Sequence, residues 1–205
     1  MSSWVRYDAK RGTIEPDPGR RSWSGPRDHP VLARRGLLLF LVPLSSMFAL
    51  VVAAYVMRRQ LGDWQPVPLP WQLWLSTALL VGSSLAFERA RRAATSTASV
   101  DLRPGLLLAA LLTVGFLGSQ LWAWQVLLDR GYTLAGNPAS SFVYLMSGLH
   151  ALHLVGGLLA WLRARAALGR GEPEKARVVI RLCAVYWHFL LVVWLVLFGV
   201  LLLLA

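Results

Sequence analysis

The chain has 205 residues, of which 56% are hydrophobic and only 15% are charged. A soluble domain of this length carries more charge, so a water-soluble globular protein is excluded. The formal net charge is +11. Its basic residues lie in short segments beside long apolar runs, and no nucleic-acid-binding motif accompanies them, which argues against nucleic-acid binding. We therefore interpret the chain as an all-α, polytopic membrane protein.

The predicted elements begin with a polar, basic stretch that contains several prolines, and this composition predicts a mostly disordered cytoplasmic tail over residues 1–34. No short apolar core with a small-residue cleavage site is found there, so we expect no cleaved signal peptide. Five apolar segments follow and predict a five-helix transmembrane domain over residues 35–205. Each approaches the roughly 20 residues that a helix needs to cross about 30 Å of hydrocarbon. The expected spans are about 36–57, 70–89, 104–128, 140–162 and 179–204.

The basic residues are distributed unevenly between the two sides of these spans. One side holds the tail and the loops after the second and fourth spans, all of them rich in arginine. The other side holds only Arg58, Arg59 and Arg130. The positive-inside rule therefore predicts that the N-terminus lies inside and the C-terminus outside. Five spans also require the two ends to lie on opposite sides, so the two inferences agree.

Three histidines fall inside the last two spans. His150 and His153 are three residues apart and share one face of the fourth span, and His188 lies in the fifth. The helical rise places all three near mid-bilayer, where they could lie close together. Polar residues in hydrocarbon normally face a protein interior or carry function. Gln120, in the third span, could likewise hydrogen-bond across helices. Small residues that would permit close helix approach in the fourth span are Gly148, Gly156 and Ala160.

A metal or haem site at these histidines is one hypothesis. No carboxylate or cysteine of matching depth completes it, and two histidines spaced i, i+3 cannot hold both faces of one haem. We therefore expect neutral histidines that form a structural polar interface, with no catalytic, cofactor-binding or metal-binding residue in this chain. Cys183, the one cysteine, is expected to be a small buried side chain. Glu88 is expected to pair with Arg91 and Arg92 near the inner end of the second span.

Two stretches resemble a known family. Gly148-Leu-His150-Ala-Leu-His153-Leu-Val-Gly156-Gly-Leu is similar to a G-x-H-x-x-H-V-x-x-G stretch of subunit III of the haem-copper oxidases. Tyr186-Trp-His188-Phe resembles the Y-W-H-F signature of that family, and Val193-Trp194-Leu-Val-Leu-Phe198 the V-W-x-x-L-F that follows it. The family includes related small subunits of quinol oxidases and some nitric oxide reductases. Five spans resemble its short form, which lacks the first two helices.

The resemblance implies a non-catalytic accessory subunit of a terminal respiratory oxidase in a bacterial inner membrane, with no chemistry in this chain alone. Haem and copper are then expected in the partner catalytic subunit, which takes electrons from cytochrome c or quinol. Such a subunit packs on the catalytic subunit and other oxidase subunits, binds phospholipids in a cleft, and supports proton uptake and stability during oxygen reduction. Arg177 and Arg181, at the inner end of the last helix, are placed to meet a lipid headgroup.

Two positions depart from the family pattern. The family often has a glutamate shortly before a Met-Phe pair, where this chain has Ser45, and an aspartate where it has Leu191. A proton-linked role that depends on those carboxylates is therefore in doubt.

Three alternatives stay open. The chain could be an accessory subunit of a nitric oxide reductase, or a small membrane haem-binding protein that uses His150, His153 or His188. It could also be a small solute carrier with a site at these histidines, although the lack of an internal repeat argues against a carrier.

Overall fold

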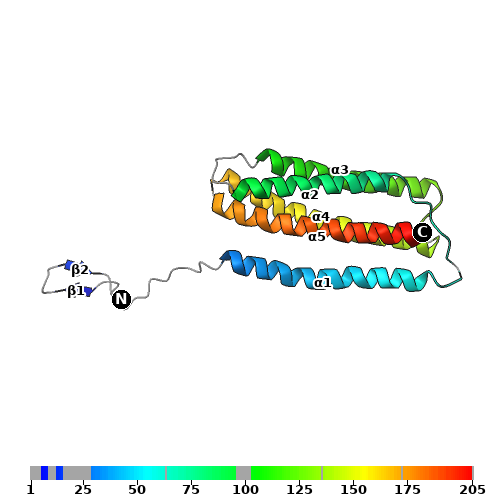
Figure 1. Ribbon diagram of the computed structural model, residues 1–205, viewed down its shortest axis with the longest axis horizontal. Coiled ribbons are helices and arrows are strands. Elements are labelled where there is room, and N and C mark those ends of the chain that lie inside the picture. The colour runs from blue at the N-terminus through cyan, green and yellow to red at the C-terminus, as the bar shows by residue number, and fades with distance from the viewer. Residues whose placement is uncertain are drawn as a thin grey trace.

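The computed structural model describes residues 6–8, 13–15, 29–62, 64–95, 103–134, 136–171 and 173–204. Long helices dominate these residues and run back and forth along one direction, so that α1 begins and α5 ends at opposite ends of the bundle (Figure 1). Each predicted span is helical except for residues 70 and 71, which precede α2, and each helix extends beyond its span at one end or both. The helices are α1 (His29–Arg58), α2 (Gln72–Thr95), α3 (Arg103–Asp129), α4 (Pro138–Gly169) and α5 (Pro173–Leu204).

Four helices, α1, α3, α4 and α5, are long and apolar enough to cross a membrane. The second half of α2 lowers its hydropathy because it carries Glu88, Arg89, Arg91 and Arg92. α2 nevertheless packs along α3 and α5 inside the bundle (Figure 1). The chain is therefore a multi-pass membrane protein, and a crossing by α2 stays a prediction.

Two short strands precede the helices. β1 (Arg6–Asp8) pairs antiparallel with β2 (Thr13–Glu15), and Tyr7 lies opposite Ile14. These strands differ from the expected disordered tail, and the other residues before His29 lie outside the described part. α1 also begins earlier than expected, because Pro30 in its first turn is compatible with a helix start.

α1 is the least buried of the four candidate spans. Only 17% of its most apolar window is buried, compared with 44% in α3. Among the described helices and strands, α1 contacts only α4 and α5. Its buried side chains, Leu41, Leu44, Phe48 and Tyr55, belong to one cluster with residues of those two helices. α1 therefore lies beside a tighter bundle of α2 to α5.

The turn into α4 is fixed by Asn137. Its side-chain oxygen accepts a hydrogen bond from the backbone N–H of Ala139 at 3.0 Å, which satisfies one free donor of the first turn. Its side-chain amide donates to the carbonyl oxygen of Gln65 at 2.6 Å. Pro138 follows at the first helical position, where its missing N–H has no consequence. One residue thus starts α4 and holds the segment between α1 and α2.

Candidate functional site

His150 lies in the interior of the bundle and has no exposed surface. Its ring centroid is 6.3 Å from that of Phe48, 5.6 Å from that of Phe116 and 5.2 Å from that of Trp194. Neither ring nitrogen has a hydrogen-bond partner among the described residues. A buried polar group without a partner costs about 1–3 kcal/mol. The His150 ring therefore packs in the core as an aromatic side chain, and it forms no hydrogen bond with the described residues.

His153 lies one turn further along α4 and is partly buried. Its Nδ1 donates to the carbonyl oxygen of Leu149 at 2.6 Å, and its ring lies 5.3 Å from that of Phe48. The Tyr186 hydroxyl of α5 donates to the carbonyl oxygen of His153 at 3.1 Å. The His150–His153 face of α4 therefore meets both α1 and α5.

Gln120 belongs to a different interface, between α3 and α2. Its side-chain amide donates to the hydroxyl of Ser76 at 2.9 Å, and both residues are buried. Ser119 donates to the carbonyl oxygen of Gln72 at 2.9 Å in the same interface. These hydrogen bonds join α2 to α3 across the apolar span.

Tryptophan side chains supply further interhelical hydrogen bonds that the sequence patterns did not predict. In four of them the indole N–H reaches an oxygen on another helix, which satisfies the one polar atom of a large apolar side chain, whereas the buried indole N–H of Trp64 has no partner among the described residues. The number of tryptophans in the sequence was the one indication of these bonds, because the N–H of a buried indole needs an acceptor. The pairs are Trp124 with the Ser147 hydroxyl, Trp161 with the Leu106 carbonyl, Trp187 with the Thr113 hydroxyl and Trp194 with the Thr77 hydroxyl.

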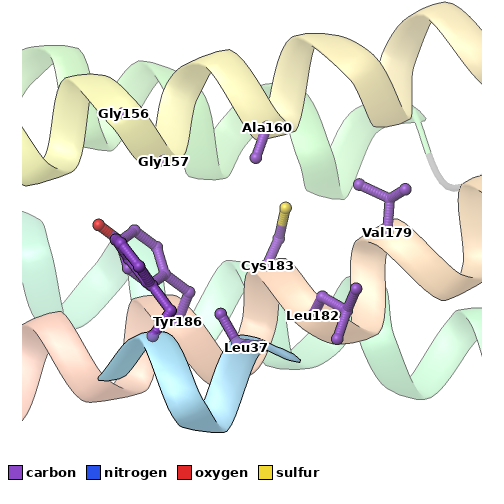
Figure 2. A pocket seen from close by; sticks show the side chains of 9 residues that line it. Leu37, Gly156, Gly157, Ala160, Val179, Leu182, Cys183 and Tyr186 are labelled. Carbon is purple, nitrogen blue, oxygen red and sulfur yellow. The ribbon is translucent and has the colours of Figure 1, made fainter. Parts of the chain in front are cut away.

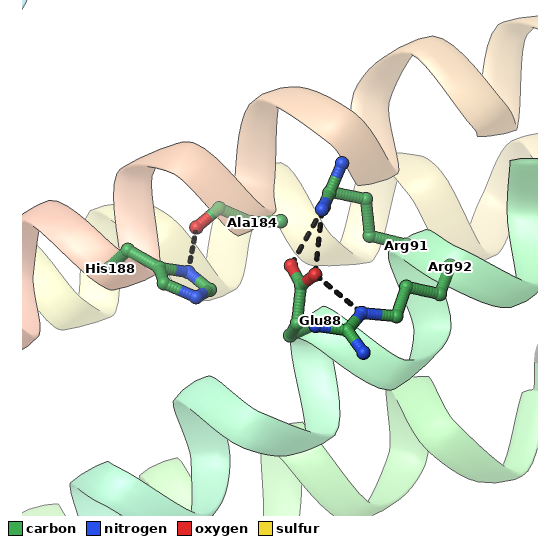
Figure 3. Close-up of polar contacts among 5 residues, drawn as sticks. All are labelled: Glu88, Arg91, Arg92, Ala184 and His188. Atoms are coloured by element: carbon green, nitrogen blue, oxygen red, sulfur yellow. Dashed lines mark hydrogen bonds and ion pairs between the residues drawn. The ribbon is translucent and has the colours of Figure 1, made fainter.

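His188 lies apart from the other two histidines, exposed on the flank of α5 that adjoins α2 (Figure 3). Its Nδ1 donates to the carbonyl oxygen of Ala184 at 2.6 Å, and Ala184 packs in a cluster with Phe87 of α2. Successive helical residues are rotated by about 100°, so His188 points away while Trp187 is buried. The structure thus brings His150 and His153 together, whereas His188 is exposed on another side of α5.

Glu88 of α2 forms the predicted ion pairs near this flank (Figure 3). It accepts two hydrogen bonds from Arg91, at 2.7 and 2.6 Å, and one from Nε of Arg92 at 2.8 Å. Bidentate pairs of this kind fix both geometry and charge. The pairing predicted from the i, i+3 and i, i+4 spacing is therefore confirmed.

An apolar cavity of about 330 Å³ opens between α1, α4 and α5 (Figure 2). Glycines on α4 leave much of this space, because a Cβ added at Gly156 would meet no atom within 4 Å. The thiol of Cys183 is buried in its wall, as expected. The lining residues are Leu37, Phe40, Gly156, Gly157, Ala160, Val179, Leu182, Cys183 and Tyr186.

Gly157, next to Gly156, is the point of close contact between α4 and α5. A Cβ at Gly157 would lie 2.9 Å from the ring of Trp187, whereas a Cβ at Gly148 would lie 3.5 Å from the ring of Trp124. The close approach expected at Gly156 therefore occurs one residue later.

The described residues contain no group of three or more His, Cys, Asp or Glu side chains placed to hold a metal ion. Within the same residues, no pair of histidines on facing helices could ligate one haem from both sides, because His188 lies outside the interior. Arg177 and Arg181 lie in the first turns of α5, partly buried and exposed respectively, and close in sequence to the cavity-lining Val179 and Leu182.

The comparison with protein families decides the identity of this bundle. The sequence profile of the family described as Cytochrome c oxidase subunit III matches residues 32–204, which include most of α1 and all of α2 to α5. The chain belongs to the cytochrome c oxidase subunit III family. It is thus an accessory subunit of a haem-copper oxidase.

Individual relatives agree with the family match. The chain is 29% identical over 199 residues to the cytochrome c oxidase subunit 3 of Thermostichus vulcanus, covering 93% of this chain and 96% of the relative. It is 29% identical over 179 residues to a probable cytochrome c oxidase subunit 3 of Nocardia farcinica, covering 84% and 88%. A third relative, cytochrome c oxidase subunit 3 of Synechocystis sp., is 29% identical over 181 residues, covering 85% and 76%.

The two positions at which this subunit III chain lacks a carboxylate lie on α1 and α5. Ser45 is exposed on α1 and donates its hydroxyl to the carbonyl oxygen of Leu41 at 2.8 Å. Leu191 is partly buried on α5 and packs against an apolar cluster. Neither residue therefore places a charge on these surfaces.

Proposed function

We propose that this chain is the non-catalytic subunit III of a terminal respiratory haem-copper oxidase in a bacterial inner membrane, where it packs on the catalytic subunit. The family match over residues 32–204 carries this proposal. The helical bundle supports it, because His150 and His153 are used in helix packing. Electron transfer and oxygen reduction would then occur on the haem and copper of the partner, with cytochrome c or quinol as donor.

We also propose that α2 is the fifth span, with the N-terminus inside and the C-terminus outside, and that residues 35–205 act as one membrane domain. The packing of α2 between α3 and α5 supports a crossing. The basic residues support the orientation, because α1 begins, α2 ends and α5 begins at the same end of the bundle (Figure 1).

A gentle detergent purification of the tagged chain, with an optical spectrum and identification of co-purified subunits, tests the accessory role. We expect a larger polytopic subunit to co-purify, and the haem absorption to belong to that subunit. A lone, colourless chain would contradict the proposal, and a lone chain with its own haem spectrum would favour a small haem-binding protein. Oxygen or nitric oxide consumption by the purified complex separates an oxidase from a nitric oxide reductase.

Lipid binding is the second part of the proposal. The apolar cavity between α1, α4 and α5 is suited to an acyl chain, and Arg177 and Arg181 flank two of its lining residues on α5. A basic residue near an anionic membrane surface is worth about 1 kcal/mol. Replacing both arginines with leucine should therefore weaken retention of anionic phospholipid by about tenfold or more.

The lipid phosphorus and headgroup content of the purified protein measures this effect. Arg130→Leu is the matched control, because Arg130 is exposed at the opposite end of the bundle. Equal anionic lipid content in the double variant and the control would refute the proposal that Arg177 and Arg181 bind a lipid headgroup. Support of proton uptake stays part of the proposed role, and we assign it to no residue, because Ser45 and Leu191 replace the carboxylates.

A further inference from the structure

His188 is a polar side chain exposed on an apolar membrane span. It lies within the candidate span Ala176–Leu203, about 10 Å deeper than Arg181 by helical rise. Its Nδ1 donates to the Ala184 carbonyl, so the neutral ring keeps its Nε2 lone pair as an acceptor. No described residue donates to Nε2. Lipid chains cannot donate to it either, and an unsatisfied polar group in hydrocarbon is unfavourable.

The surface around His188 is shaped for another helix. Val185, Val192 and Leu195 are exposed on the same face of α5, at spacings of three and four residues from His188 or from one another. Beside them a groove of about 480 Å³ lies between α1 and α5, and small residues, Ala49 and Ala53, line its α1 side. Small residues permit close approach of helices in membranes. Figure 1 shows α5 between α1 and α2, which flank this face.

The exposed face of the first half of α3 lacks such a polar group. The exposed side of α3 in the same depth range presents Leu107, Leu108, Leu111 and Val114. Lipid chains can cover such a face without cost, because it exposes no side chain that needs a hydrogen bond. The α5 face differs from this α3 face because His188 leaves an acceptor that lipid chains cannot satisfy.

We propose that the outer face of α5, formed by Val185, His188, Val192 and Leu195, is the docking surface for a transmembrane helix of the catalytic subunit. That helix presents a hydrogen-bond donor to Nε2 of His188. This inference rests on the proposed accessory function and adds which face is used. A phospholipid fits less well, because its donors stay at headgroup level, whereas a helix carries side-chain donors at any depth.

Photo-crosslinking in the intact complex tests the docking face. A benzophenone amino acid is placed at Val192, which is 59% exposed, and at Leu111 of α3 as the matched control, which is 60% exposed. We expect Val192 to crosslink to the catalytic subunit and Leu111 to crosslink only to lipid. Crosslinks to the catalytic subunit from Leu111 alone, to lipid alone from Val192, or to a second copy of this chain from Val192 would each overturn the proposal.

Substitution of His188 tests the hydrogen bond. His188→Phe keeps an aromatic ring and removes the acceptor, so association with the catalytic subunit should weaken about two- to tenfold. His188→Gln keeps an acceptor and should restore part of that loss. Because His188 is exposed, the thermal stability of the chain without its partner should stay unchanged. Equal association of the Phe variant and the unchanged chain would refute the hydrogen bond.

The two proposals fail in distinguishable ways. If no larger subunit co-purifies with the unchanged chain, the accessory function fails. If it co-purifies but crosslinks to a face other than that of Val192, only the docking surface fails.

Discussion

Replacing Gly157 with alanine should destabilise the packing of α4 on α5. The added Cβ would lie 2.9 Å from Cη2 and Cζ3 of Trp187 and 3.1 Å from Cε1 of Tyr186. Trp187 cannot move aside easily, because its ring is fully buried 4.2 Å from that of Phe87 and its indole N–H donates to the Thr113 hydroxyl at 3.1 Å. Overpacking of a core typically costs about 1–3 kcal/mol.

Gly156→Ala is the matched control, since its Cβ meets no atom within 4 Å on the same turn of the same helix. Both variants gain up to about 1 kcal/mol of helix propensity, so their difference isolates the steric effect. We expect Gly157→Ala to be less stable than Gly156→Ala by about 1–3 kcal/mol. Unfolding in mixed micelles of increasing SDS fraction, followed by circular dichroism, measures the difference. Equal stability of the two variants would refute the contact between Gly157 and Trp187.

Two further substitutions test the interior and the loop. His150→Phe removes two buried, unpartnered nitrogens and keeps an aromatic ring, so the free energy of unfolding should rise by about 1–3 kcal/mol. A loss of stability above about 1 kcal/mol in the same SDS titration would contradict this and show that His150 has a polar partner. Asn137→Ala removes the N-cap of α4 and the bond to Gln65, and should lower the free energy of unfolding by about 1–2 kcal/mol. For this variant, Pro138 and its neighbours should also become more accessible to proteases, and unchanged cleavage together with unchanged stability would contradict the capping role.

The positions of the helices were predictable from the sequence, because the length and apolar character of a run determine whether it can cross a membrane. For α3 the predicted span, residues 104–128, differs from the observed helix, Arg103–Asp129, by one residue at each end. α2 was less certain for a physical reason. Glu88 and its arginines lie in its last turns, where a helix leaves the hydrocarbon, and they lower its hydropathy although they pair with each other.

The rotation of each helix about its own axis was not predictable. A span that is apolar on all sides carries little amphipathic signal to show which face is inside. Helical rise predicted how deep His188 lies in the membrane, but not which side of α5 it occupies. The sequence therefore could not show that His188 is exposed while His150 is buried. For the same reason the sequence could not tell Gly156 from Gly157, although only one of them contacts Trp187.

The sparse packing of α1 has a consequence for the order in which the protein is assembled during synthesis. α1 leaves the ribosome before α2 to α5, yet among the described helices its contacts are with α4 and α5, the two made latest of these five. Its cluster residues Phe48 and Tyr55 therefore lack these neighbours until more than half of the chain has entered the membrane. α1 must wait in lipid, held by its own backbone hydrogen bonds, while α2 and α3 pair. Truncation before α4 should thus leave a paired α2–α3 unit and an α1 that can still meet other membrane proteins.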